Sequence, residues 1–187
     1  MATTMPNSAR SLLGVTLLAA TAAVLAVTAL ADGATGRLNC EIKENGKSAS
    51  GTVALEKDGA QVASGSCGKP LSAPPGSYTA VLGLDGALDG PVQQKPVTVQ
   101  AGAEAKVEAD FSTGTVTVRI LQAGKPAAGM AVIRRDGKQV GTLGSGVAAH
   151  LSTGSYEITA RYRVQQKLFE KVQLTAGQNV ELQADFE

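Results

Sequence analysis

The stretch STGSYEITA (152–160) has a near copy in PPGSYTAVL (74–82). In both places Gly-Ser-Tyr begins a run in which apolar and polar side chains alternate. Alternation with a period of two residues is typical of a β-strand that is buried on one face. This strand belongs to a longer repeat, and that repeat decides the fold.

The repeat covers most of the chain. Residues 36–78 align with residues 114–156 without a gap, at a constant offset of 78. Beyond the Gly-Ser-Tyr strand the offset falls to 75, where VTVQAGAEAKVEADF (97–111) aligns with VQLTAGQNVELQADF (172–186). The first copy therefore carries three additional residues between these segments. Self-similarity over this length predicts two copies of one fold.

Each copy, 36–111 and 114–187, is predicted to be an antiparallel β-sandwich of about seven strands. Segments such as TVTVRI (115–120) alternate in polarity, and the Asp-Gly pairs at 58–59 and 136–137 indicate hairpin turns, because Gly accepts a positive φ. No segment of either copy shows sustained helical periodicity. The predicted fold class is therefore all-β, with two tandem Ig-like or prealbumin-like sandwiches.

The N-terminal segment, residues 1–31, is predicted to be a signal peptide. Residues 12–31, LLGVTLLAATAAVLAVTALA, carry no charge, follow the single cationic side chain of Arg10 and end in a small-x-small pattern. Cleavage after Ala31 would make Asp32 the first residue of the mature chain. The alternative is an uncleaved membrane anchor, because about 20 apolar residues span a bilayer. Either reading places the rest of the chain outside the cytoplasm, in the periplasm or as a secreted protein.

Composition argues against some classes of function. The chain is 43% hydrophobic and 18% charged, which is enough apolar material for a packed core. Its formal net charge of +1 gives no general attraction to nucleic acid or to an anionic membrane surface. We therefore expect no nucleic-acid partner, and membrane contact only through an uncleaved N-terminal segment.

The two copies are expected to touch and to differ in charge. Only residues 112–114 separate their outermost strands, and three residues reach about 10 Å at full extension. Residues 36–113 carry seven Lys or Arg and nine Asp or Glu, whereas residues 114–187 carry nine and six, so the net charges are −2 and +3. Opposite signs would favour head-to-tail contact, although ordinary solvated faces are the simpler explanation.

The pattern of turns and strands resembles a known group of sandwich domains. GTVTVRILQAGKPAAGMAVIRRDGKQVGT (114–142), followed by LSTGSYEITARY (151–162), resembles carboxypeptidase regulatory-like domains and the related transthyretin-like and Cna B-type sandwiches. The Asp-Gly hairpin and the Leu-x-x-Gly-x-Tyr strand are also similar to the PEGA repeat of bacterial envelope proteins. The resemblance covers residues 36–187 and implies architecture, because nearly every matching residue is a turn or core position. Members of this group are mostly non-catalytic modules for attachment, spacing or ligand contact.

The two cysteines, Cys40 and Cys67, both lie in the first copy, where the second has Val118 and Ser145. An even number of cysteines in an exported chain favours a disulfide, which would stabilise the fold by roughly 3–4 kcal/mol. The alternative is a pair of buried free thiols. We expect no metal site or cofactor, because two cysteines without a nearby histidine cannot complete a tetrahedral shell. The Lys–Asn isopeptide bond of some Cna B-type domains is not expected, because the first-strand positions are Cys40 and Val118.

Two segments are candidate contact sites. The additional residues fall in GLDGALDGPVQQKP (83–96), where Asp85 and Asp89 lie four apart in a Gly-rich loop. Such a loop can present binding groups, and calcium favours its oxygen ligands but needs about six of them. The alternative is a pair of solvated turn carboxylates. The equivalent hairpin of the second copy is basic, and its candidate contact residues are Arg161, Tyr162, Arg163, Lys167 and Phe169.

Function follows from what these residues offer. His150, the only histidine, is expected at the surface or rim, because no serine lies in the Gly-x-Ser-x-Gly turn that would favour a catalytic triad. We therefore expect no enzyme. The leading hypothesis is an exported cell-envelope protein that acts as a structural spacer or protein–protein interaction module, with another envelope protein as partner. The alternative is an accessory protein that binds a glycan or a peptide. For a glycan, Tyr162 and Phe169 are the aromatic side chains expected to be exposed.

Overall fold

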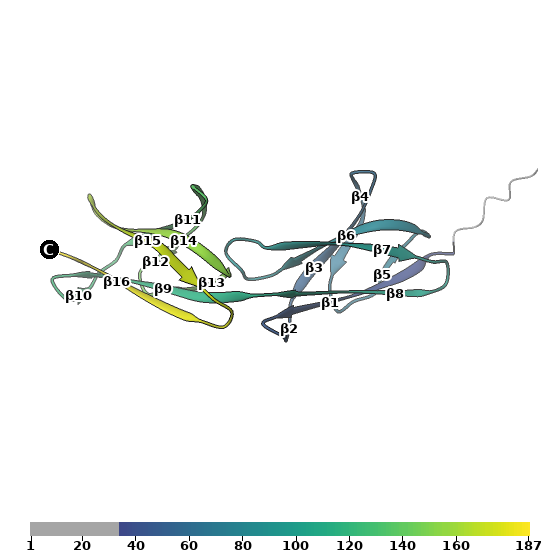
Figure 1. Cartoon of the computed structure of the whole chain (residues 1–187), viewed down its shortest axis with the longest axis horizontal. Helices are drawn as coiled ribbons and strands as arrows, with labels where there is room; N and C mark the ends of the chain where they lie inside the picture. Colours follow the sequence, from purple (N-terminus) through teal and green to yellow (C-terminus); the bar gives the residue numbers. More distant parts are fainter. Residues whose placement is uncertain (1–33) are drawn as a thin grey trace, which may run out of the picture. The chain divides into compact units, whose positions relative to one another are not determined.

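The computed structural model describes residues 34–187, so the predicted signal peptide lies outside the described residues. Residues 34–187 form sixteen β-strands in four sheets (Figure 1). This arrangement confirms the all-β fold class with two tandem β-sandwiches. In the described part of the chain, no helix has the length and apolar character needed to cross a membrane.

The first sandwich is built from the strands of the first copy. Their bounds are β1 Gly36–Glu44, β2 Lys47–Ala49, β3 Gly51–Lys57, β4 Ala60–Ser66, β5 Leu71–Ala73, β6 Gly76–Leu84, β7 Val92–Val99 and β8 Glu104–Phe111. One sheet has the strand order β4-β3-β6-β7, and all its pairs are antiparallel. In the other sheet β1 pairs antiparallel with β2 and β5, and parallel with β8.

The second sandwich repeats this plan. Its strands are β9 Thr113–Gln122, β10 Lys125–Pro126, β11 Met130–Arg135, β12 Lys138–Gly144, β13 Ala148–Ser152, β14 Gly154–Tyr162, β15 Gln165–Leu174 and β16 Asn179–Phe186. The antiparallel sheet has the order β12-β11-β14-β15, and β9 pairs with β10, β13 and, in parallel, β16. The sequence predicted antiparallel sandwiches, and the parallel pairing of the first strand with the last in each sandwich is an addition to that plan.

The hairpin turns follow the predicted signals. Asp58 and Gly59 have φ values of 53° and 78°, and Asp136 and Gly137 have values of 50° and 75°. Two consecutive positive φ values are what a type I′ turn requires. These turns join β3 to β4 and β11 to β12, as predicted.

Each sandwich buries its own apolar core. The first core includes Leu38, Ile42, Leu55, Leu82 and Phe111, and the second includes Val118, Ile120, Ile133, Ile158 and Phe186. Burial of one such side chain stabilises the fold by about 1.5–3 kcal/mol. Because the inward side chains come from both sheets of a sandwich, the cores fix which face of each sheet remains at the surface.

The recurrence of Gly-Ser-Tyr has a structural cause. The Tyr78 hydroxyl donates to the Pro74 carbonyl over 2.8 Å, and the Tyr156 hydroxyl lies 2.7 Å from the Ser152 carbonyl. In each sandwich the tyrosine therefore bonds the backbone four residues earlier, as in a tyrosine corner.

Candidate functional site: the junction between the two repeats

The loop between β6 and β7, residues 85–91, contacts the second sandwich. The Leu88 N–H donates to the His150 carbonyl over 2.8 Å, and Ala87 forms a parallel β-bridge with His150. The Leu88 side chain packs against the second core. A Cβ on Gly141 would overlap Leu88 Cγ, so the absence of a side chain at Gly141 makes room for this contact.

Asp89 joins the same loop to the second sandwich through polar contacts. Its side chain is only 6% exposed. The carboxylate accepts from the Ser152 N–H at 3.1 and 3.2 Å and from the Tyr156 hydroxyl at 3.0 Å. Arg135 Nη1 lies 3.7 Å from the same carboxylate. Burial and then the neighbouring Asp89 carboxylate raise the pKa of Tyr156 above its ordinary range, so the phenol keeps its proton and remains a donor.

The two carboxylates of this loop, Asp85 and Asp89, differ from each other in exposure, although the sequence suggested a matched pair. Asp85 is exposed, but the carboxylate of Asp89 is buried against groups of the second sandwich. The alternative, that both are solvated turn carboxylates, is wrong for Asp89, because the second sandwich covers this part of the loop. A partner-binding role stays a prediction, and Asp85 is the carboxylate free to take it up at the surface.

A second group of contacts lies where β8 leads into β9. Glu44 Oε1 accepts the Thr113 hydroxyl at 2.5 Å and lies 2.9 Å from His150 Nδ1. The Asn45 side chain donates to the Thr113 carbonyl at 3.1 Å and accepts the Thr113 N–H at 3.0 Å. The His150 side chain is 52% exposed, which confirms its predicted position at the rim. These bonds tie the end of β1 to the beginning of the second sandwich.

Glu44 should make the junction sensitive to acid. Burial raises the pKa of Glu44, but the hydrogen bonds from Thr113 and His150 outweigh burial and hold the pKa below its ordinary value of 4.5. A carboxyl group with a lowered folded-state pKa stabilises the protein above its unfolded pKa, and this contribution is lost as pH falls through the folded pKa. We expect Glu44→Gln to reduce the loss of melting temperature on acidification below pH 4.5. Calorimetry of both proteins across this range checks it, and identical acid profiles would contradict it.

Cys40 and Cys67 form a disulfide with their Cα atoms 4.7 Å apart, which confirms the predicted pairing. The bond joins β1 to the turn that follows β4. In the second sandwich the Ser145 hydroxyl oxygen accepts from the Ile120 N–H at 3.0 Å at the corresponding place. The backbone hydrogen bonds that the two sandwiches share are Cys67 N–H to Gly51 O, Gly68 N–H to Cys40 O, Ser145 N–H to Gly129 O and Gly146 N–H to Val118 O. The disulfide therefore adds a covalent bond to a contact that both sandwiches make.

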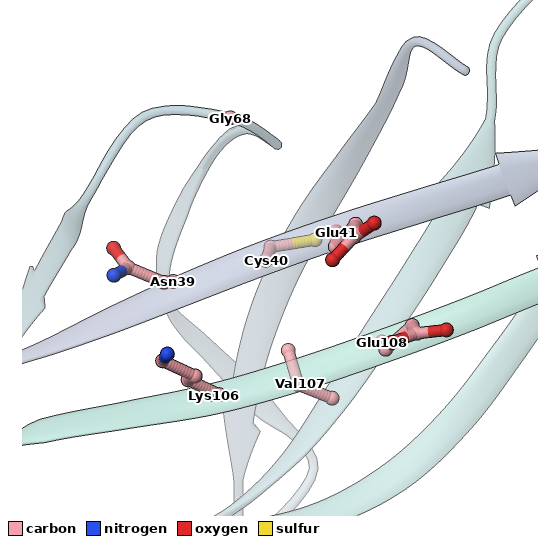
Figure 2. A pocket seen from close by; sticks show the side chains of 7 residues that line it. All are labelled: Asn39, Cys40, Glu41, Gly68, Lys106, Val107 and Glu108. Atoms are coloured by element: carbon pink, nitrogen blue, oxygen red, sulfur yellow. The ribbon is translucent and has the colours of Figure 1, made fainter. Parts of the chain in front are cut away.

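A depression of about 430 Å³ lies beside the disulfide, over β1 and β8 (Figure 2). Its lining residues are Asn39, Cys40, Glu41, Gly68, Lys106, Val107 and Glu108. Lys43 Nζ lies 2.5 Å from Glu108 and 3.6 Å from Glu41, so both carboxylates are engaged within the chain. The hydrogen bond from Lys43 to Glu108 raises the pKa of Lys43 and keeps this cation charged. Within residues 34–187 no group of three or more His, Cys, Asp or Glu is placed to hold a metal ion.

The basic hairpin of β14 and β15 differs from its prediction at Tyr162. This side chain is 8% exposed, its hydroxyl donates to Gln122 Oε1, and its ring stacks on Phe186 with the centroids 5.9 Å apart. The expectation that Tyr162 is exposed is therefore wrong. Period-two alternation from the buried Ile158 and Ala160 directs Tyr162 inward, and this signal was available in the sequence.

The other predicted hairpin residues lie at or near the surface. Arg161 is exposed, and the Arg163 guanidinium lies 5.1 Å from the centre of the Tyr162 ring. Phe169 is partly buried against the second core, with the Lys167 ammonium 5.5 Å from its ring centre. The hairpin therefore presents cations over aromatic rings, which is a cation–π arrangement, and does not present a bare aromatic face.

Comparison with known proteins gives likeness of structure at low identity. No protein-family model matches the sequence, and no curated protein matches it significantly. The TIE protein of Bacillus anthracis is similar at 14% identity and a TM-score of 0.35, with 82% of this chain and 34% of that chain covered. A candidate adhesin of Bacteroides ovatus is similar at 7% identity and a TM-score of 0.41, with 82% of this chain and 93% of that chain covered. A fimbrial protein of Bacteroides ovatus is similar at 9% identity and a TM-score of 0.35, with 82% of this chain and 50% of that chain covered.

These likenesses carry no inference about what the chain does, because each TM-score is below 0.5. The chain spans about a third of the length of the Bacillus anthracis protein. The resemblance to carboxypeptidase regulatory-like and transthyretin-like domains stays a prediction, since no family model matches.

Proposed function

We propose that this protein acts outside the cytoplasm as a non-catalytic structural spacer or protein–protein interaction module of the cell envelope. The observation that carries this proposal is the junction. A single residue, Ser112, separates β8 from β9, and Leu88, Asp89 and Glu44 add contacts on either side of it. Neighbouring domains move relative to each other unless their interface prevents it. These contacts would hold whatever binds to the two sandwiches in a fixed relation.

Export is supported by two independent features of the chain. The Cys40–Cys67 disulfide suits an oxidising compartment, because thiols in the cytoplasm are kept reduced. The apolar segment at residues 12–31 has the layout of a signal peptide. We infer cleavage after Ala31, with an uncleaved anchor as the alternative.

A glycan-binding role has less support from the aromatic side chains. A glycan platform needs an aromatic ring with one face open. Five of the six aromatic residues in the chain are buried, and the sixth, Phe169, is partly buried beneath Lys167. The spacer or interaction role is therefore favoured over the glycan-binding one.

Cell fractionation tests the proposed function. The full chain is produced in a bacterium that exports it, and each fraction is analysed by N-terminal sequencing, thiol titration and capture of partners from an envelope extract. We expect an extracytoplasmic chain that begins at or near Asp32, has no free thiol and retains an envelope protein. Asp85→Asn should weaken capture if the exposed loop carboxylate takes part. A reduced chain in the cytoplasm would contradict the proposal.

A further inference from the structure

The outer faces of the two antiparallel sheets are built from corresponding positions of the two repeats, but these positions carry different side chains. In β3 the buried residues Val53 and Leu55 point into the first core, so Thr52 and Ala54 point outward. The same alternation applies to β11, where Ala131 and Ile133 are buried. These outer faces belong to the sheets β4-β3-β6-β7 and β12-β11-β14-β15, and the junction contacts described above do not use them.

The outer face of the first sandwich is a groove with a floor of small side chains. A depression of about 460 Å³ lies over β3, β4, β6 and β7. Ala54, Ser64 and Gly83 are part of its floor, and Val92 lines one side with 62% of its surface exposed. A Cβ at Gly83 would lie 3.2 Å from Thr52 Oγ1, so even a small side chain there would begin to fill the groove.

The outer face of the second sandwich is a ridge of large apolar side chains. Met130 is 54% exposed and Leu168 is 53% exposed. Val132 and Leu168 lie in one row across β14, because both pair with Thr159. Val132 is only 6% exposed, so Met130 and Leu168 form the exposed apolar part of this face. Exposed apolar side chains that gather on one face are a mark of an interaction surface.

The groove and the ridge carry side chains of opposite size and charge at corresponding positions of the two repeats. At the offset of 78, Thr52 corresponds to Met130, Ala54 to Val132, Gly83 to Arg161, Glu56 to Arg134 and Asp85 to Arg163. Small side chains of the groove are thus replaced by larger ones on the ridge. Glu56 and Asp85, which follow Ala54 and Gly83 by two residues in the sequence, are likewise replaced by the arginines that follow Val132 and Arg161 by two residues. Glu157, paired with Arg134, is an acidic side chain on the ridge face.

We propose that the ridge of one copy docks in the groove of a second copy, so that the chain self-associates head to tail. The apolar side chains of the ridge would fill a groove of small residues, and the two arginines would meet Glu56 and Asp85. Such charge complementarity favours this contact over ridge-to-ridge contact, where arginines would face arginines. A head-to-tail contact produces a ring or an open chain of copies. This inference goes beyond the proposed function, and the spacer role would stand if it failed.

Exchange of residues between the two repeats tests the proposal. The ridge variant is Met130→Thr with Leu168→Gln, since Thr52 and Gln94 occupy the matching positions in the first sandwich. The groove variant is Ala54→Val with Gly83→Arg. Each new residue already occurs at the matching position of the other repeat, so we expect both variants to fold, and calorimetry verifies this. Val62→Thr, at a 47% exposed apolar position outside the groove lining, is the control.

Sedimentation velocity of the disulfide-bonded chain isolated from an exporting host provides the readout. We expect wild type and Val62→Thr to pass beyond the dimer as concentration rises. Each variant alone should associate at least about tenfold more weakly. An equimolar mixture of the two variants should form a dimer and stop there, because only one intact groove and one intact ridge remain.

Three outcomes would overturn the proposal. The first is a wild-type chain that stays monomeric at every concentration. The second is a groove variant that still self-associates, which would indicate contact between two ridges. The third is a mixture of folded variants that forms no dimer. None of these outcomes bears on export or on the junction, so failure here is distinguishable from failure of the proposed function.

Discussion

Asp89→Ala will lower the free energy of unfolding by about 3 kcal/mol. The substitution removes a carboxylate that is 6% exposed and leaves the Ser152 N–H without its acceptor. The Tyr156 hydroxyl keeps only the Ser152 carbonyl as an acceptor. The ion pair with Arg135 contributes little of the loss, because the Arg135 side chain is 39% exposed and water replaces its partner.

Urea unfolding and calorimetry measure this effect, and two further variants assign it to the buried carboxylate. Asp85→Ala removes the same charge from an exposed position of the same loop and should change stability by less than about 0.5 kcal/mol. Asp89→Asn keeps an acceptor for the Ser152 N–H and should fall between these two. Equal free energies of unfolding for Asp89→Ala and Asp85→Ala would contradict the structural role of Asp89. They would indicate that both carboxylates are exposed to solvent.

Loss of the disulfide is expected to have a comparable effect. The bond closes a segment with a sequence separation of 27 residues, for which chain entropy predicts about 3.5 kcal/mol of stabilisation. The second sandwich indicates which residues can replace the two cysteines, because it has Val118 and Ser145 at the corresponding positions. In Cys40→Val with Cys67→Ser, a serine hydrogen bond like that of Ser145 should offset about 1 kcal/mol of the loss.

The matched comparison is Cys40→Ala with Cys67→Ala, which offers neither the hydrogen bond nor the volume of valine. We expect this variant to be the less stable of the two, and both to be less stable than the oxidised protein. Urea unfolding under non-reducing conditions gives the three free energies. If wild type unfolds at the same urea concentration with and without a reducing agent, the disulfide does not stabilise the fold.

Several features of the fold could be predicted because they depend on residues close together in the chain. The Asp58-Gly59 and Asp136-Gly137 turns need only two consecutive residues that accept positive φ. The inward direction of Tyr156 follows from alternation within one strand. The disulfide could be predicted because the chain has only two cysteines, which allow one pairing, and because a signal peptide was predicted.

Other features depend on contacts between distant segments. The burial of Asp89 requires that the first sandwich's loop reach the second sandwich, and no local pattern states where that loop lies. One signal was present in the repeat itself, because Ala63 in the first copy corresponds to Gly141 in the second, where Leu88 needs room. The parallel pairing of β1 with β8 is likewise set by packing over the whole sandwich, since an extended segment has the same alternation in either direction.

Residual dipolar couplings will show most directly whether the junction holds the two sandwiches in one fixed orientation. Backbone amide couplings are measured for residues 36–111 and 114–187 in weakly aligned protein. We predict that a single alignment tensor fits both sets in the wild type. In Gly141→Ala, which puts a methyl group where Leu88 packs, each sandwich should require its own tensor. Two different tensors in the wild type would mean that the sandwiches move independently, and would contradict a spacer built on the contacts of Leu88, Asp89 and Glu44.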